Sequence, residues 1–66
     1  MIVTVNGQDR QVTPGTTVAQ LVGQVAGGGR GTAVAVDGTV VPRGGWPERL
    51  LRDGDVVELV TAVQGG

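Results

Sequence analysis

The sequence contains no serine, cysteine, histidine, lysine or tyrosine. These residues supply most of the side-chain nucleophiles and general bases that enzymes use. Threonine hydroxyls remain, but no histidine or lysine is present to activate one. The aspartates and glutamates stand singly in predicted turns or at positions expected to be exposed. We therefore predict that the chain is not an enzyme by itself.

The other absences exclude further classes of function. Without cysteine there is no disulfide, and without cysteine or histidine we predict no metal site. Five scattered arginines, one aromatic residue and a net charge of −1 argue against binding to nucleic acid. No apolar run is long enough for a membrane span, and no secretory signal is visible. We therefore expect a cytoplasmic protein that binds no membrane.

The apolar residues that are present are mostly valine, which favours strands. Asn6-Gly7 and Asp37-Gly38 are strong signals for tight hairpin turns, and each lies between two strand-like runs. We predict five strands, at residues 1–5, 8–13, 32–36, 39–41 and 56–62.

One helix is predicted between the second and third strands. Thr16 or Thr17 can cap its first turn. Its apolar stripe consists of Val18, Leu21, Val22 and Val25. The three glycines at 27–29 end the helix and continue as a loop.

The resulting order is β-β-α-β-β-(short helix)-β. The last strand has no hairpin partner, so we place it beside the equally apolar first strand. This predicts an α+β fold, a β-grasp (ubiquitin-like) roll with a mixed sheet of four to five strands and one main helix across one face. We expect one domain over residues 1–62 and a flexible tail over residues 63–66.

Two features of the last third of the chain admit two interpretations each. Trp46 is predicted to plug one end of the core, with an interface anchor as the alternative. Asp53-Gly54-Asp55 suggests calcium, but turn chemistry explains both aspartates and the acidic residues of a calcium loop do not follow.

Alternation in the last strand suggests an apolar outer face. If Glu58 faces solvent, Val60 and Ala62 share its face, and Ile2 of the first strand joins them. These residues are either scattered surface side chains or a patch on which a partner docks. The pattern by itself leaves both interpretations open.

The last four residues, Val63, Gln64, Gly65 and Gly66, offer the remaining chemistry. Four extended residues reach about 13 Å, enough to enter a partner's active site. Glycine fits a narrow channel because it has no side chain. We predict that the carboxylate of Gly66 is the reacting group, once a partner has joined it to AMP.

The stretch AVAVDGTVVPRGGW, the later DGD and the final GG together resemble the ThiS family of sulfur carrier proteins of thiamine biosynthesis. The resemblance covers essentially all 66 residues. It implies a carrier that binds no cofactor itself. A ThiF-like enzyme adenylates Gly66 with ATP and Mg²⁺, and a cysteine desulfurase supplies sulfur for a terminal thiocarboxylate.

The resemblance further implies that a ThiG-like thiazole synthase receives the sulfur. It also implies that the outer face near Val60 and Ala62 docks both the ThiF-like enzyme and the ThiG-like synthase. Three alternatives stay open: a MoaD-like small subunit of molybdopterin synthase, a ubiquitin-like protein modifier, and a plain binding domain.

Overall fold

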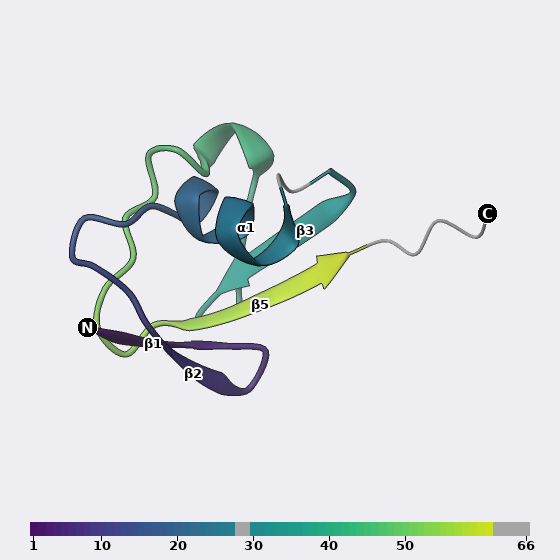
Figure 1. Cartoon of the computed structure of the whole chain (residues 1–66). Helices are drawn as coiled ribbons and strands as arrows, with labels where there is room; N and C mark the ends of the chain where they lie inside the picture. The colour runs from purple at the N-terminus through teal and green to yellow at the C-terminus, as the bar shows by residue number, and fades with distance from the viewer. Residues whose placement is uncertain (28–29, 62–66) are drawn as a thin grey trace.

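In the part of the chain that the structure describes, five strands and one α-helix form two layers (Figure 1). The computed structural model describes residues 1–27 and 30–61. The elements are β1 (Ile2–Val5), β2 (Gln8–Gln11), α1 (Val18–Ala26), β3 (Thr32–Val36), β4 (Thr39–Val41), the 3₁₀ turn η1 (Arg43–Gly45) and β5 (Val56–Thr61). This order confirms the predicted one. Among the described residues, no helix has the length and apolar character needed to cross a membrane.

The sheet has the strand order β2-β1-β5-β3-β4. β1 and β5 run parallel, whereas the other neighbours run antiparallel. β5 is therefore the central strand, and it lies between two hairpins that come from the two halves of the chain. This confirms both the predicted place of the last strand and the β-grasp roll.

The ends of α1 are fixed by its sequence. Thr17 is the N-cap: its hydroxyl accepts a hydrogen bond from the backbone N–H of Gln20 at 3.2 Å. The side chain of Gln20 accepts one from the backbone N–H of Thr17 at 2.9 Å, which completes a capping box. Gly27 ends the helix with φ of 66°, a left-handed conformation that favours glycine. Gly28 and Gly29 of the predicted loop lie outside the described residues.

The core lies between α1 and one face of the sheet. Its fully buried members are Val3, Val18, Leu21, Val22, Val34 and Val57. The predicted stripe is wrong at its last position, because Val25 is 41% exposed. Val25 lines a groove together with polar residues of the first hairpin, among them Gln8 and Arg10 of β2. The end of the helix therefore faces mostly polar side chains of the first hairpin, with Val5 as the one other apolar residue of the groove, and Val25 stays partly exposed.

Candidate functional site

The face of the sheet opposite α1 has an apolar surface over its last three strands. A shallow hollow there is lined by β5, β3 and β4. Ala33 lies opposite Val60, and Ala35 lies opposite both Glu58 and Val40. We call these five residues the outer patch: Ala33, Ala35, Val40, Glu58 and Val60.

The valines of the outer patch are far more exposed than valine usually is. Val60 is 67% exposed and Val40 is 68% exposed. They belong to adjacent parts of one surface, because β3 and its alanines connect β5 to β4. Strand alternation by itself is compatible with both scattered valines and a docking patch. Contiguity across three strands supports the docking patch.

β3 and β4 contribute to this face residues that were not among the predicted ones. Alternation in TAVAV was the available signal. Val34 and Val36 are buried on the helix side, so Ala33 and Ala35 must face outward. Val40, in the next strand, could have been placed by the same reasoning through the Asp37-Gly38 hairpin.

Ile2 lies on the outer face as expected, and it is 42% exposed. However, the parallel register pairs Thr4 with Val56. Ile2 precedes this pair by two residues and Val60 follows it by four. At about 3.3 Å per residue, Ile2 and Val60 are separated by roughly 20 Å along the strands. Ile2 is therefore at the other end of the sheet from the outer patch.

Glu58 is the only charged member of the outer patch. It is exposed, and alternation places it between Val56 and Val60 on the outer face of β5. Within the described part of the chain, no ion pair involves its carboxylate. A partner that covers the outer patch must therefore cover an unpaired negative charge.

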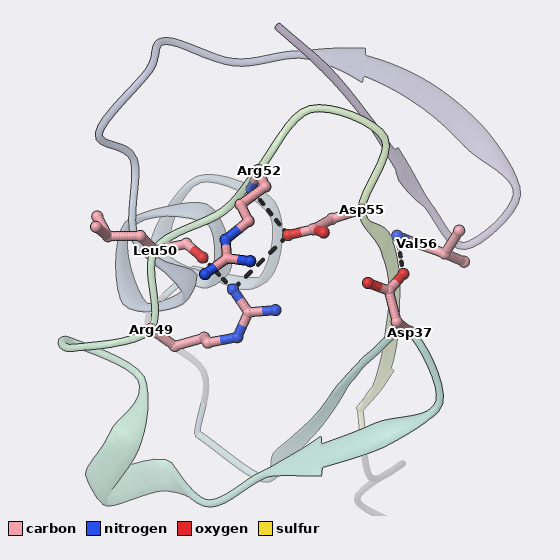
Figure 2. Close-up of polar contacts among 6 residues, drawn as sticks. All are labelled: Asp37, Arg49, Leu50, Arg52, Asp55 and Val56. Atoms are coloured by element: carbon pink, nitrogen blue, oxygen red, sulfur yellow. Dashed lines mark hydrogen bonds and ion pairs between the residues drawn. The ribbon is translucent and has the colours of Figure 1, made fainter.

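Two hairpin turns hold β5 from opposite sides. Asn6 and Asp37 occupy equivalent positions in the two Xaa-Gly turns, with φ of 49° and 50°. The carboxylate of Asp37 accepts a hydrogen bond from the N–H of Val56 at 2.9 Å (Figure 2). The amide of Asn6 bonds both backbone groups of Leu59: its oxygen accepts from the N–H at 2.8 Å, and its nitrogen donates to the carbonyl at 3.1 Å.

The Asp53-Gly54-Asp55 segment is a structural turn. Asp53 accepts a hydrogen bond from the N–H of Ile2 at 2.8 Å. The buried carboxylate of Asp55 accepts one from the N–H of Arg52 at 2.8 Å and lies 3.7 Å from the guanidinium of Arg49 (Figure 2). Over residues 1–27 and 30–61, no group of three acidic, histidine or cysteine residues could hold a metal ion. Turn chemistry therefore accounts for both aspartates.

Trp46 is buried, which confirms the interpretation as a core plug. Its indole N–H donates a hydrogen bond to the carbonyl of Val41 at 2.8 Å. The guanidinium of Arg43 covers the ring at 4.8 Å from the centroid.

The predicted reacting end cannot be placed in the same way. Ala62, Val63, Gln64, Gly65 and Gly66 lie outside the described residues. The structure does place the strand that leads to them, because β5 ends at Thr61.

The fold and the central position of the last strand define the structural class of this protein. One helix across a mixed sheet, with the C-terminal strand at its centre, is the arrangement of the small β-grasp proteins. Within that class, the ThiS family model matches residues 3–66. The chain therefore belongs to the ThiS family.

Individual relatives agree with this assignment. Sulfur carrier protein ThiS of Escherichia coli (strain K12) is 34% identical over 61 residues, which is 92% of each chain. The crystal structure of thiamine biosynthesis protein ThiS from Geobacter metallireducens superposes with a TM-score of 0.83 at 28% identity, covering all of both chains. A solution structure of a thiamine biosynthesis protein from the same organism gives 0.81, also at 28% identity, covering all of this chain and 88% of the other.

A further relative is much longer than this chain. Thiazole synthase of Paramagnetospirillum magneticum (strain ATCC 700264 / AMB-1) is 30% identical over 66 residues. The match spans all of this chain but only 20% of the synthase. A segment similar to the whole chain is therefore part of a larger protein with that name.

Proposed function

We infer that this protein is a sulfur carrier of thiamine biosynthesis, on which partner enzymes act. The observation that carries this conclusion is the family match, which extends to Gly66. The Escherichia coli relative, a sulfur carrier by name, aligns over nearly its whole length. The poverty of nucleophiles and bases in the sequence supports a carrier over a catalyst.

We propose that sulfur is transferred to the carboxylate of Gly66 in three successive reaction steps. A carboxylate oxygen attacks the α-phosphorus of ATP, and pyrophosphate leaves with the electron pair of the broken P–O bond. A cysteine persulfide then attacks the carbonyl carbon, and AMP leaves, giving an acyl disulfide. A thiol finally cleaves the S–S bond, forming a disulfide with the cysteine sulfur and releasing the terminal thiocarboxylate. ATP, Mg²⁺ and the persulfide belong to the partners.

The proposed partners are a ThiF-like adenylating enzyme, a cysteine desulfurase and a ThiG-like thiazole synthase. The proposal of the synthase is supported by the similarity of this chain to a segment of a longer protein named thiazole synthase. In this scheme residues 63–66 enter the active sites of the adenylating enzyme and of the thiazole synthase, while the domain stays outside.

The outer patch is the surface that we propose for docking. Val60 provides exposed apolar area on the strand that leads to residues 62–66, and Val40 adds to it from β4. Covering Glu58 without a counter-charge would bury an unpaired carboxylate, which is strongly unfavourable. We therefore expect each partner to place an arginine or lysine opposite Glu58. A cation at that point would also fix the orientation of the carrier.

Intact-mass spectrometry tests the proposed function. The purified chain is incubated with the adenylating enzyme, ATP, Mg²⁺, the desulfurase and cysteine. The expected product is heavier by the difference between one sulfur and one oxygen atom, and a chain truncated before Gly66 should gain nothing. An unchanged mass, under conditions in which the same enzymes load a known carrier, would contradict the proposal.

Genetic complementation separates the alternatives. A sulfur carrier for thiazole should remove the thiazole requirement of a strain that lacks its own carrier. Restored molybdoenzyme activity without restored thiazole synthesis would favour the MoaD-like alternative. Recovery of the chain only in covalent adducts with other proteins would favour a ubiquitin-like modifier.

A further inference from the structure

The pairing between β1 and β5 is short. Only two pairs are in register, Thr4 with Val56 and Val5 with Val57. Beyond them β1 turns away into its hairpin, whereas β5 continues for four more residues to Thr61 (Figure 1). On its β3 side, β5 remains paired over its last residues, up to Thr32 with Thr61. The last residues of β5 would therefore be held on one side only, without a further contact from the first hairpin.

Asn6 makes that contact. Its side-chain amide presents one acceptor and one donor to Leu59, as a neighbouring backbone would in a sheet. Both bonds are partly buried and link positions 53 residues apart in the sequence. The backbone N–H of Asn6 adds a third bond, to the carbonyl of Val57 at 2.9 Å. The Asn6 side chain thus extends the β1–β5 pairing by two residues toward the C-terminal end.

The left-handed backbone of Asn6 is what aims the amide at β5. With φ of 49°, Asn6 is in a region that asparagine and glycine tolerate better than other residues. Asparagine is therefore one of few residues that can both form this turn and bond Leu59. Resting on the proposed function, we propose that Asn6 is a positioning residue, which fixes the end of β5 so that Gly66 is delivered to the partner's active site in a reproducible place.

Asp37 provides a matched control. It has the same backbone conformation, is followed by glycine in the same way, and also bonds β5 through its side chain. Its bond is to Val56, at the start of the strand and far from the C-terminal end. Asn6→Gly and Asp37→Gly therefore each remove side-chain bonds to β5 while preserving a turn that glycine tolerates. Only the Asn6 variant removes the contact between the first hairpin and the end of the strand.

Amide hydrogen exchange first checks that each substitution acts where intended. In Asn6→Gly the N–H of Leu59 should exchange faster, and in Asp37→Gly the N–H of Val56 should. Unfolding curves then set a temperature at which both variants are fully folded. These measurements separate a change at one end of β5 from a general loss of stability.

The decisive measurement is pyrophosphate release by the ThiF-like adenylating enzyme, with kcat and KM determined for the carrier. Asn6→Gly should lower kcat roughly tenfold, because small misplacements of a reacting group are costly, and should change KM little because the outer patch is intact. Asp37→Gly should leave both constants within about twofold of wild type, since its bond lies away from the reacting end. Asn6→Asp keeps the acceptor for Leu59 N–H but lacks the donor, so its kcat should fall between those of wild type and Asn6→Gly.

Different results would contradict the proposed function and the positioning role of Asn6. If the wild-type chain releases no pyrophosphate, the proposed function is wrong and the positioning role falls with it. If wild type is active but Asn6→Gly and Asp37→Gly have equal kcat, only the positioning role is refuted. An Asn6→Gly variant that raises KM and leaves kcat unchanged would likewise refute it, because Asn6 would then act on docking.

Discussion

Truncating Val60 to alanine should weaken partner binding by a predictable amount. The substitution removes two methyl groups, whose complete burial is worth about 1.6 kcal/mol at about 0.8 kcal/mol per carbon. Since Val60 is 67% exposed in the free protein, about two thirds of this value, roughly 1 kcal/mol, remains for a partner to gain. The dissociation constant should therefore rise about fivefold.

Isothermal titration calorimetry with the adenylating enzyme, in the absence of ATP, measures this change without the chemistry. Val60→Ala should leave the free energy of unfolding within about 0.5 kcal/mol of wild type, because the side chain is largely outside the core. Urea denaturation of the free protein checks this, so that a weaker complex is not confused with a less folded carrier.

Ile2→Ala is the control for Val60→Ala. It also truncates an exposed side chain of the outer face, but at the end of the sheet away from the outer patch. Its dissociation constant should match that of wild type. Equal weakening by both substitutions would refute a patch confined to β3, β4 and β5, and no effect from Val60→Ala would refute docking through the outer patch.

The remaining predictions concern stability and are read from urea denaturation. Gly23→Ala should raise the free energy of unfolding by about 0.5–1 kcal/mol, because Gly23 is inside α1 and a new Cβ would meet no atom within 4 Å. Gly27→Ala should instead lower it by about 1 kcal/mol, since Gly27 has φ of 66°. Asp55→Ala should lower it by about 1–3 kcal/mol, because the partly buried hydrogen bond from the N–H of Arg52 to a charged acceptor is lost. Trp46→Phe should lower it by about 1 kcal/mol through loss of the bond to Val41, and circular dichroism must follow this variant because Trp46 is the only tryptophan.

Local signals in the sequence were sufficient for most of the fold. The two Xaa-Gly turns, the glycines after α1 and the apolar stripe each follow from the conformational preferences of a few neighbouring residues. The place of β5 beside β1 followed from hydrophobicity and from the lack of another partner. The prediction that Val25 is buried was wrong, because the apolar stripe shows which face of the helix is apolar but not how far the opposing sheet extends.

The candidate site was less predictable because it depends on register. Alternation placed Ile2 and Val60 on one face, but only the pairing of Thr4 with Val56 shows that they lie at opposite ends. The same pairing explains why the role of Asn6 was not visible. In the sequence, the Asn6-Gly7 turn is enough to explain why asparagine stands at position 6. The hydrogen bonds between Asn6 and Leu59 exist only because β5 continues beyond its pairing with β1.

The central position of β5 in the sheet links the proposed docking of a partner on the outer patch to the place where the last five residues begin. Val57 and Leu59 are buried against the core, so β5 cannot rotate without exposing them. Hydrogen bonds to β3 on one side, and to β1 and Asn6 on the other, prevent it from sliding. Val60 therefore has a fixed relation to the point where β5 ends, and a partner that binds the outer patch also receives the start of the last five residues in a defined place. An edge strand, free on one side, would loosen this relation, which gives a physical reason for the proposed reacting end to follow the central strand.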